Sequence, residues 1–255
     1  MHDLKNLIEK YGKKKINTLT KYPSILTLHK LGEKGRLLPE MTTDISGESM
    51  YATEKIDGTN VRIISYNGDY AFGSREFILY HCDDLYFDPA MGIVEGLKRL
   101  DVRIPQAPNL TVVYGELYGM SISSNSKWYG KDSLGFRVFD VAVYKDLSIL
   151  ELPQESISLW REKETENGIV YGQNFLSRKE IDEQFSNYAL VPAIEFELKD
   201  FQHSSVLDAL RQYSPTTRVA LSETATNKCE GVVLRNESRT KIVKLRFEDY
   251  ERTLR

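Results

Sequence analysis

Residues 54–60 contain a lysine in a setting suited to covalent chemistry. The segment reads Glu54-Lys55-Ile56-Asp57-Gly58-Thr59-Asn60, and the β-branched run 61–64 follows it directly. A lysine reacts as a nucleophile only when its amine is neutral, so its ordinary pKa of about 10.4 must be lowered or its proton must be removed during the reaction. Gly58 permits a tight turn that brings the backbone close to a ligand. Taken alone, such a segment is more typical of a surface turn than of an active site.

Other residues suited to nucleotide chemistry follow Lys55 in order along the chain. Each of these residues lies in or beside a strand-like run. They are Arg75 after Phe72-Gly73-Ser74, Glu116 between Gly115 and Leu117, Phe139 before Asp140, Glu230 before Gly231, and Lys244 with Arg246. Any one of them, considered alone, is more commonly a core or surface residue than a functional one. Residues two apart in a strand point to the same side, so Lys244 and Arg246 are expected on one face. With the Lys55 segment these make six clusters in sensible strand context, and coincidence is an unsatisfactory explanation.

These residue types match the needs of phosphorus chemistry. Attack by Lys55 on the α-phosphate of ATP develops negative charge, which Lys244, Arg246 and a divalent metal would offset. The carboxylates of Glu116 and Glu230 are suited to Mg²⁺ or to ribose hydroxyls. Phe139 offers a flat face on which adenine can stack. The sequence therefore predicts a nucleotide site built around a reactive lysine.

The elements expected to position these residues are strands and helices in mixed order. Helical spacing is present over 4–11, 84–100, 154–166, 177–188 and 203–213, and Ser177 with Glu180 forms a capping-box pattern. Strand-rich patterns run from about Tyr51 to Tyr144 and return over 231–235 and 241–245. We expect an α+β fold of antiparallel sheets flanked by helices.

Composition excludes several other classes of protein. The 255 residues carry a net charge of −3, which is unlike a general nucleic-acid coat protein, although a local basic groove remains possible. The two cysteines are too few for a disulfide scaffold. Neither a membrane-spanning run nor the apolar core of a signal peptide is present in the sequence. We expect a cytoplasmic protein, or a phage- or virus-encoded one that acts in a host cytoplasm.

The ordered motifs resemble those of the covalent nucleotidyltransferase superfamily, which contains ATP-dependent DNA ligases, RNA ligases and mRNA capping enzymes. Lys55-Ile56-Asp57-Gly58 resembles motif I, and motifs III, IIIa, IV and V correspond to Glu116, Phe139-Asp140, Glu230-Gly231 and Lys244. The resemblance implies a nucleotidyltransferase (ATP-grasp-like) domain. We expect residues 1–255 to form one adenylyltransferase domain, with an N-terminal segment 1–50 and a motif-bearing core 51–247.

Asn60 distinguishes branches of the superfamily. DNA ligases and capping enzymes usually carry arginine at this position, whereas the segment 54–60 is similar to the RNA ligase 2 branch, as is Lys21-Tyr22-Pro23-Ser24-Ile25. The resemblance implies that Lys55 takes AMP from ATP with Mg²⁺ or Mn²⁺, passes it to an RNA 5′-phosphate, and allows a 3′-hydroxyl to seal the strand. The RNA ends would lie in a nicked duplex or in single strands, and the protein would be a monomer without a membrane partner.

The same resemblance implies roles for individual residues. The catalytic group would comprise Lys55, Asp57, Glu230 and Lys244, and Glu116 and Glu230 would hold the metal. The nucleotide-binding group would comprise Glu54, Lys55, Ile56, Asn60, Arg75, Glu116, Phe139, Glu230, Lys244 and Arg246. Asn60 and Arg75 would act near the RNA end.

Two departures from the superfamily pattern leave alternatives open. Arg246 stands where motif V usually has a second lysine, and guanidinium does not reproduce the point charge of an ammonium group. Only eleven residues follow Lys244, so we expect no C-terminal OB-fold or other accessory domain. The alternatives to an RNA ligase are an ATP-dependent DNA ligase, a capping-type guanylyltransferase using GTP, and an inactive nucleic-acid binding module.

Overall fold

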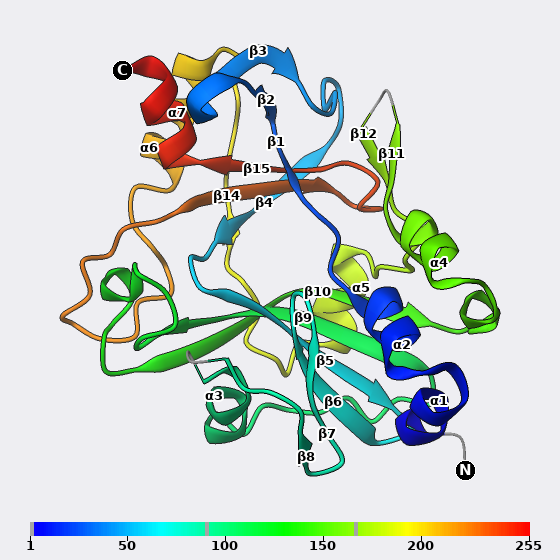
Figure 1. The fold of residues 1–255 in the computed structure, drawn as a ribbon. Helices are drawn as coiled ribbons and strands as arrows, with labels where there is room; N and C mark the ends of the chain where they lie inside the picture. Colours follow the sequence, from blue (N-terminus) through cyan, green and yellow to red (C-terminus); the bar gives the residue numbers. More distant parts are fainter. Residues whose placement is uncertain (1–2, 90–91, 166–167) are drawn as a thin grey trace.

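Two main sheets lie one above the other in the computed structural model, which describes residues 3–89, 92–165 and 168–255 (Figure 1). The lower sheet has six antiparallel strands, in spatial order β10 (Leu134–Tyr144), β9 (Leu110–Gly119), β5 (Thr59–Tyr66), β6 (Asp69–Ser74), β7 (Ile78–His81) and β8 (Asp84–Leu85). The upper sheet has five, in order β1 (Leu26–Thr27), β15 (Ile242–Arg246), β14 (Gly231–Asn236), β4 (Met50–Lys55) and β13 (Ala193–Ile194).

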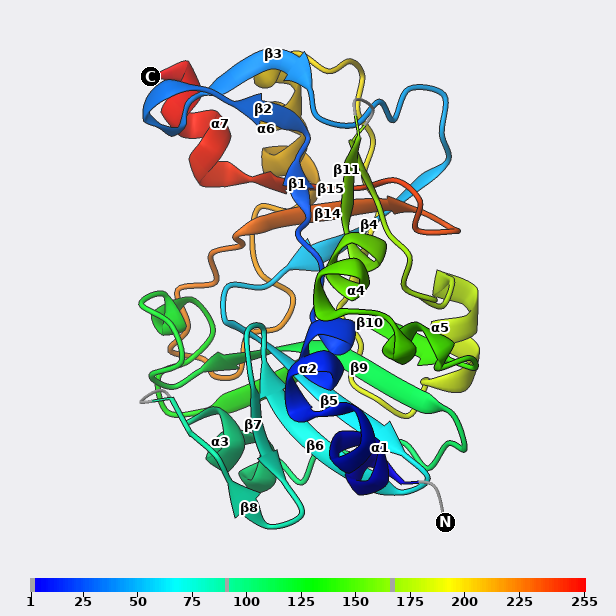
Figure 2. The ribbon, with the colours of Figure 1, turned by 45° about the vertical axis from the view of Figure 1, so that its right-hand side comes forward.

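Both faces of the lower sheet are buried. Ile64 and Val112 pack with helices α1 (Leu4–Tyr11), α2 (Lys13–Thr20) and α4 (Gln154–Arg161) on one face. Ile63 and Val113 pack with α3 (Ile93–Arg99) and α5 (Arg178–Gln184) on the other. Neighbouring residues of one strand thus enter different cores, because side chains alternate across a strand. The result is a rigid sheet between two helical layers (Figure 2).

The upper sheet is covered by helices on one face only. Val232, Leu234, Val243 and Leu245 pack against α6 (His203–Tyr213) and α7 (Phe247–Leu254). The alternating residues Val233 and Lys244 therefore face the lower sheet, where they line a cavity between the two sheets. Because of this alternation, β14 and β15 contribute to the hydrophobic core on one face and to the cavity on the other face.

Most expected elements are confirmed, together with the α+β arrangement of antiparallel sheets flanked by helices. The first helix has the expected bounds, 4–11, the third helix of the later region spans 203–213, and Ser177 and Glu180 form a capping box. One strand pair departs from the antiparallel pattern, because β1 runs parallel to β15.

Three expected helices were too long. The helix expected over 154–166 ends at Arg161, because the polar run 162–165 offers no apolar face to pack. Instead, β11 (Lys163–Thr165) pairs with β12 (Gly168–Val170). Residues 166–167 lie outside the described part. The helix expected over 84–100 is limited to α3 within the described residues, because Pro89 and the left-handed Gly92 interrupt the pattern; residues 90–91 lie outside the described part. The helix expected over 177–188 ends at Gln184, and Phe185 leaves helical geometry.

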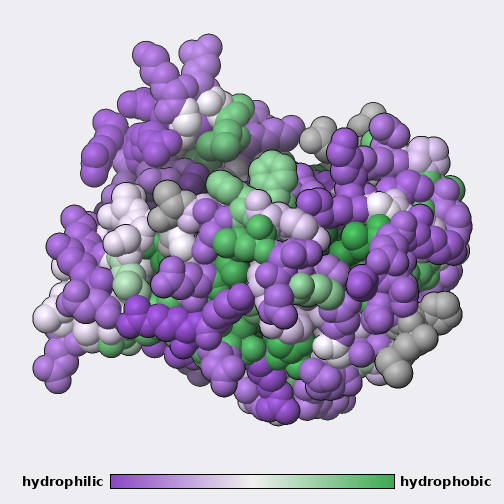
Figure 3. Space-filling model, turned by 60° about the horizontal axis from the view of Figure 1, so that its bottom comes forward, coloured by the Kyte–Doolittle hydropathy of each residue, from purple (hydrophilic) through white to green (hydrophobic). Residues whose placement is uncertain are grey.

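The remaining elements are short. A hairpin joins β2 (His29–Leu31) to β3 (Leu37–Met41), and 3₁₀ turns occupy Glu33–Gly35, Ser126–Trp128 and Ser148–Glu151. The lower face of the molecule carries hydrophobic residues among hydrophilic ones (Figure 3), and Phe77, Leu85 and Phe87 on or beside β7 and β8 are each more than half exposed. Among the described residues, no helix combines the length and apolar character needed to cross a membrane.

Candidate active site

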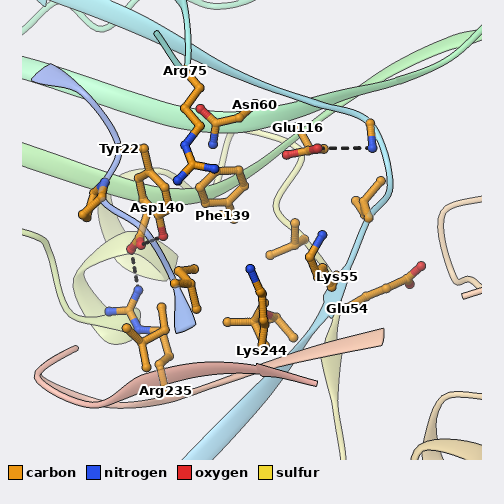
Figure 4. Close-up of a pocket in the computed structure, with 18 of the residues that line it drawn as sticks. Tyr22, Glu54, Lys55, Asn60, Arg75, Glu116, Phe139, Asp140, Arg235 and Lys244 are labelled. Atoms are coloured by element: carbon orange, nitrogen blue, oxygen red, sulfur yellow. Dashed lines mark hydrogen bonds and ion pairs between the residues drawn. The ribbon is translucent and has the colours of Figure 1, made fainter. Parts of the chain in front are cut away.

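A cavity of about 370 Å³ opens between the two sheets, a size typical of small-molecule sites. Most residues expected for nucleotide chemistry contribute to its wall, among them Lys55, Lys244, Asn60, Arg75, Glu116 and Phe139. These residues come from β4, β5, β9, β10 and β15 and from the loop after β6. In Figure 4 the amines of Lys55 and Lys244 point into the same space, with Phe139 and Arg75 across from them. The fold therefore gathers residues that lie up to 189 positions apart.

Lys55 is the last residue of β4 and lies opposite Gly231 of β14. Its Nζ lies 2.6 Å from Oε2 of Glu230, the residue immediately before β14. Both side chains are largely shielded from water, with 26% and 13% of their surface exposed. Burial raises the pKa of the Glu230 carboxyl, although the charge of Lys55 opposes that shift. A partly buried carboxylate beside a lysine is positioned to accept its proton.

The turn after Lys55 packs tightly onto β9. A Cβ atom on Gly58 would collide with the main-chain oxygen of Leu117, so a larger residue cannot occupy this position without displacing the turn. The Gly58 N–H donates to Oε1 of Glu116 at 3.2 Å, and the Asp57 N–H donates to the Tyr129 hydroxyl at 2.7 Å. These two bonds hold the turn, and with it Lys55, against the lower sheet.

Glu116 has an unusual electrostatic setting. Burial raises the pKa of its carboxyl to about 8, the nearby Glu230 raises it too, and only the charge of Lys55 and the Gly58 hydrogen bond act in the opposite direction. Near neutral pH the side chain therefore holds a proton in the free protein. Perturbed carboxyl groups of this kind are common at functional sites.

A second cavity adjoins the first and shares Lys55, Gly58 and Glu116 with it. Its wall includes three carboxylates predicted to act in the reaction, Asp57, Glu116 and Glu230. The Asp57 carboxylate accepts a hydrogen bond from Asn125 Nδ2 at 2.6 Å. Clustered hard oxygen donors suit a divalent cation, so the donor set fits the expected Mg²⁺ or Mn²⁺ at Glu116 and Glu230.

Phe139 reaches the cavity through an irregularity in β10. The register of β10 against β9 shifts between Val138 and Asp140, which leaves Phe139 as the extra residue of a β-bulge. Its ring meets the ring of Tyr22 edge to face, with 5.0 Å between centroids. The bulge places Phe139 and its neighbour Asp140 on the same cavity wall, whereas a regular strand would turn them to opposite faces.

Asp140 anchors this wall through buried ion pairs. Its carboxylate contacts the guanidinium groups of Arg235, at 2.5 Å, and Arg239, at 2.6 Å, and accepts a hydrogen bond from the Tyr22 hydroxyl at 2.6 Å. The Asp140 and Arg239 side chains are each 1% exposed. The network joins β10 of the lower sheet to β14 of the upper sheet and to the turn that follows β14, so it fixes the spacing of the two sheets beside Phe139.

The cationic residues of the cavity differ in their partners. Arg75 Nη2 donates to the Ser24 hydroxyl at 3.0 Å, and about half of the Arg75 side chain is exposed. Burial lowers the pKa of the Lys244 ammonium, and the charges of Arg246 and Lys55 lower it further. Lys244 is therefore a cation that an anionic ligand would stabilise.

A model of the RNA ligase family matches residues 48–247. The chain belongs to the RNA ligase family. The family resemblance seen in the motifs is thereby confirmed. No curated protein matches the chain in sequence.

Solved structures of RNA ligases also resemble the chain. An RNA ligase of Naegleria gruberi, a variant described with ATP and Mn, has 15% identity and a TM-score of 0.47, covering 91% of this chain and 62% of its own. The same ligase with PPi has 16% identity, a TM-score of 0.46, and covers 91% and 63%. An archaeal ATP-dependent RNA ligase has 17% identity, a TM-score of 0.47, and covers 90% and 49%. The chain thus spans less than two thirds of each of these ligases.

Three residues expected in the nucleotide site of this RNA ligase family member differ from that expectation: Glu230 and Arg246 line the second cavity instead of the first, and Glu54 lines the first but turns its carboxylate away. The Glu54 carboxylate accepts hydrogen bonds from the Thr217 hydroxyl and the Arg218 N–H and points away from the cavity (Figure 4), because strand alternation turns it to the face opposite Lys55. Arg246 lines the second cavity, where its guanidinium donates to both carboxylate oxygens of Asp249, at 2.8 and 2.9 Å. Arg246 and Lys244 thus belong to adjoining cavities.

Several cavity residues were not among those expected from the sequence. They are Tyr22, Tyr51, Arg178, Val191, Val233 and Arg235, together with Pro23, Ile25 and Ile242. Tyr22 follows α2, whose last carbonyl groups accept hydrogen bonds from Tyr114, Tyr144 and Gln173. The resemblance of the segment 21–25 to the RNA ligase 2 branch indicated that this segment could be functional. No sequence pattern indicated that Arg178, at the start of α5, lines the cavity.

Proposed function

We propose that this member of the RNA ligase family is an ATP-dependent RNA ligase whose Lys55 becomes covalently joined to AMP. The observation that carries the proposal is the position of the Lys55 amine. It lies 2.6 Å from Glu230 and lines one cavity together with Phe139 and Lys244. A nucleophile, a stacking surface and a cation thus surround the same space, and a proton acceptor adjoins the nucleophile.

The first step follows from these positions. Glu230 takes a proton from the Lys55 ammonium group, and the neutral Nζ attacks the α-phosphorus of ATP. A nitrogen–phosphorus bond forms as the bond from the α-phosphorus to the bridging oxygen breaks, and pyrophosphate leaves. Lys244 stabilises the charge that develops on the phosphate oxygens. Adenine stacks on Phe139 of the lower sheet, with Val233 and Ile242 of the upper sheet completing an apolar slot in the same cavity.

A divalent cation, Mg²⁺ or Mn²⁺, held by Glu116 and Glu230 would offset the negative charge of the phosphates. The partial burial of both carboxylates supports this assignment, because each has a raised pKa that a nearby cation would lower.

The later steps use the RNA ends. A 5′-phosphate oxygen attacks the phosphorus of the lysyl-AMP, which releases Lys55 and gives an RNA–adenylate. A 3′-hydroxyl then attacks the 5′-phosphorus, forms the phosphodiester and releases AMP. Arg75 and Asn60 line the cavity on the side of the lower sheet, and we assign them to the RNA end. The Oδ1 atom of Asn60 is buried without a hydrogen-bond partner, which supports a ligand contact there.

All of these groups come from one chain, so we propose that the protein works as a monomer, in a cytoplasm where ATP is available. A sealing assay with nicked duplexes and with single strands distinguishes the two possible arrangements of the RNA ends.

Intact-mass measurement tests the covalent step. Incubation with ATP and Mg²⁺ is expected to add one AMP to the protein, and Lys55→Ala is expected to remain unmodified. Lys228→Ala, which removes another amine from the second cavity, is expected to retain the adduct. An AMP adduct on Lys55→Ala contradicts the assignment.

Sealing assays test the substrate. Nicked duplexes and single strands with either RNA or DNA on the 3′-hydroxyl side are to be compared, with ATP or GTP as donor. We expect sealing with ATP when the 3′-hydroxyl strand is RNA. Preference for a DNA 3′-hydroxyl strand would identify a DNA ligase, use of GTP would identify a guanylyltransferase, and RNA binding without an adduct would identify an inactive binding module.

A further inference from the structure

Three potential metal ligands meet at the end of the lower sheet that lies away from Lys55. β5 begins at Thr59 beside the cavity and runs to Tyr66, and β6 starts at Asp69 after the intervening turn. His81 ends β7 and Cys82 follows it. The ligand atoms of Asp69, His81 and Cys82 all lie within 4.8 Å of one another. The proposed ligase chemistry uses none of these residues.

The sheet register explains how they come together. Ala71 of β6 pairs with His81 of β7, and Asp69 lies two residues before Ala71, so Asp69 and His81 share one face as diagonal neighbours. Cys82 and Asp83 have φ angles of 49° and 63°, which form the tight turn between β7 and β8. This turn brings the Cys82 sulfur back toward the His81 ring.

The distances show a convergent arrangement. His81 Nε2 lies 3.1 Å from Asp69 Oδ2 and 3.1 Å from Cys82 Sγ, and Sγ lies 3.5 Å from Asp69 Oδ1. Both neighbours thus meet the same ring nitrogen. A proton relay from cysteine through imidazole to carboxylate would need one partner at each nitrogen. The cluster is therefore not built as a relay, and its three donor atoms surround one point.

These separations are close to those around a zinc ion. With zinc bonds of 2.0–2.3 Å to nitrogen, oxygen and sulfur, a tetrahedral site has donor atoms about 3.3–3.6 Å apart. The two separations from His81 Nε2, each 3.1 Å, therefore need only a small expansion to admit the ion, and Cys82 Sγ lies 3.5 Å from the other oxygen of Asp69, Oδ1.

The surroundings also fit a binding site. The His81 side chain is 5% exposed and that of Asp69 is 20% exposed, so both are held by packing. The main-chain N–H of Lys5 donates to Asp69 Oδ2 at 2.8 Å and orients the carboxylate, as a supporting contact does around protein metal ions. Cys82 is exposed, which leaves a path from solvent and room for water as a fourth ligand.

We propose that Asp69, His81 and Cys82 form a site for a divalent metal ion of the zinc class. A thiolate and an imidazole favour such an ion over Mg²⁺, and the thiolate and carboxylate together balance its two positive charges. Binding forms a metal–sulfur bond and releases the thiol proton to solvent. Through Asp69 and Lys5 the ion secures α1 to β6 and to the β7–β8 hairpin, elements that are labelled in Figure 2. The site is structural and separate from the ligase cavity, whose lining includes none of its three residues.

Cobalt titration of the metal-free full chain tests the site. One equivalent of Co²⁺ is expected to give a thiolate-to-cobalt charge-transfer absorption together with the visible bands of tetrahedral cobalt, and Zn²⁺ is expected to abolish both. Cys82→Ser removes the charge-transfer absorption, and Asp69→Asn weakens binding at least about tenfold. Asp84→Asn makes the same charge change at an exposed position of the same hairpin and keeps both signals. Cys229→Ala, which removes the other thiol, also keeps them.

Thermal melting provides an independent measurement. With Mg²⁺ present at saturation for the proposed Glu116–Glu230 site, Zn²⁺ is expected to raise the Tm of the wild-type chain and of Asp84→Asn by more than that of Cys82→Ser, since an ion stabilises only the state that binds it. Absence of the cobalt–thiolate band from a folded wild-type chain overturns the proposal. Persistence of that band in Cys82→Ser overturns it equally.

Discussion

The Lys55 amine lies 2.6 Å from the carboxylate of Glu230, although the two residues are 175 positions apart in sequence. The β4–β14 pairing creates this contact, because Gly231 lies opposite Lys55 and Glu230 immediately precedes it. The ordinary pKa of lysine, about 10.4, is too high for a neutral amine at physiological pH. In the proposed reaction, a carboxylate at this distance can receive the proton from the Lys55 amine.

Glu230→Gln is therefore expected to slow the formation of lysyl-AMP by about 10²- to 10⁴-fold, the usual contribution of a positioned proton acceptor. Single-turnover transfer from α-labelled ATP measures the rate. Glu223→Gln makes the same change on an exposed loop and is expected to keep the wild-type rate. An unchanged rate in Glu230→Gln would remove Glu230 from the mechanism.

Sequence patterns predicted most of this site, because strand alternation and motif order carry local information. The cavity gathers Lys55, Asn60, Glu116, Phe139 and Lys244 as expected from that order. Alternation also explains Glu54, which lines the cavity beside Thr53 and Lys55 but whose carboxylate accepts a hydrogen bond from Thr217 on the other face of the strand. The sequence of the segment 54–60 alone did not show that the Glu54 carboxylate faces away from the cavity.

The partners that the sequence did not reveal depend on long-range packing. Arg239 pairs with Asp140 across 99 positions, and its φ of 57° belongs to a turn that no local pattern requires. The extent of α3 was overestimated for a similar reason, since a helical pattern over 84–100 does not show where Gly92 adopts a left-handed conformation.

The raised pKa of Glu116 predicts how stability varies with pH. Its carboxyl has a folded-state pKa of about 8, above the ordinary value of 4.5, so the folded state binds the proton more tightly. The contribution to stability is complete below about pH 4.5 and is lost as pH rises through about 8. A difference of one unit between the folded-state and unfolded-state pKa corresponds to about 1.4 kcal/mol of unfolding free energy. Because water has partial access to the Glu116 carboxyl, we expect the total loss of stability to be a few kcal/mol.

Glu116→Gln cannot ionise and is expected to lack this loss. Without divalent cations, its Tm relative to wild type should rise between pH 5 and pH 9. Added Mg²⁺ is expected to stabilise the wild-type chain more at pH 8 than at pH 6, because it binds the deprotonated carboxylate. Thermal melts across this range provide the measurement, and parallel Tm curves for the two proteins would contradict the pKa shift.

Gly58→Ala is expected to disturb the active site more than the fold. The new Cβ would collide with the Leu117 oxygen and approach Glu116 Cγ to 3.0 Å, so the turn that carries Lys55 must move. Displacements of about 1 Å commonly cost about 10²-fold in rate. Labelled lysyl-AMP formation measures the loss, and circular dichroism checks the fold.

Gly47→Ala provides the matched control for that change. Gly47 has open space around its Cβ position and a φ of 72°, so alanine there meets only backbone strain of about 1 kcal/mol. Its rate of lysyl-AMP formation is expected to equal that of the wild type. Equal rates in Gly58→Ala and Gly47→Ala would show that close packing of the turn on β9 does not position Lys55.

Asp140→Asn is expected to destabilise the protein by about 3–5 kcal/mol, because it leaves the buried guanidinium groups of Arg235 and Arg239 without their counter-ion. The Nη1 atom of Arg239 already lacks a hydrogen-bond partner, so the remaining network has little capacity to compensate. Urea unfolding measures the free energy. Asp208→Asn breaks an exposed pair with Arg211 on α6, 3.7 Å apart, and is expected to cost less than about 1 kcal/mol. Similar losses in the two variants would mean that water relieves the buried charges and that Asp140 does not hold the two sheets together beside Phe139.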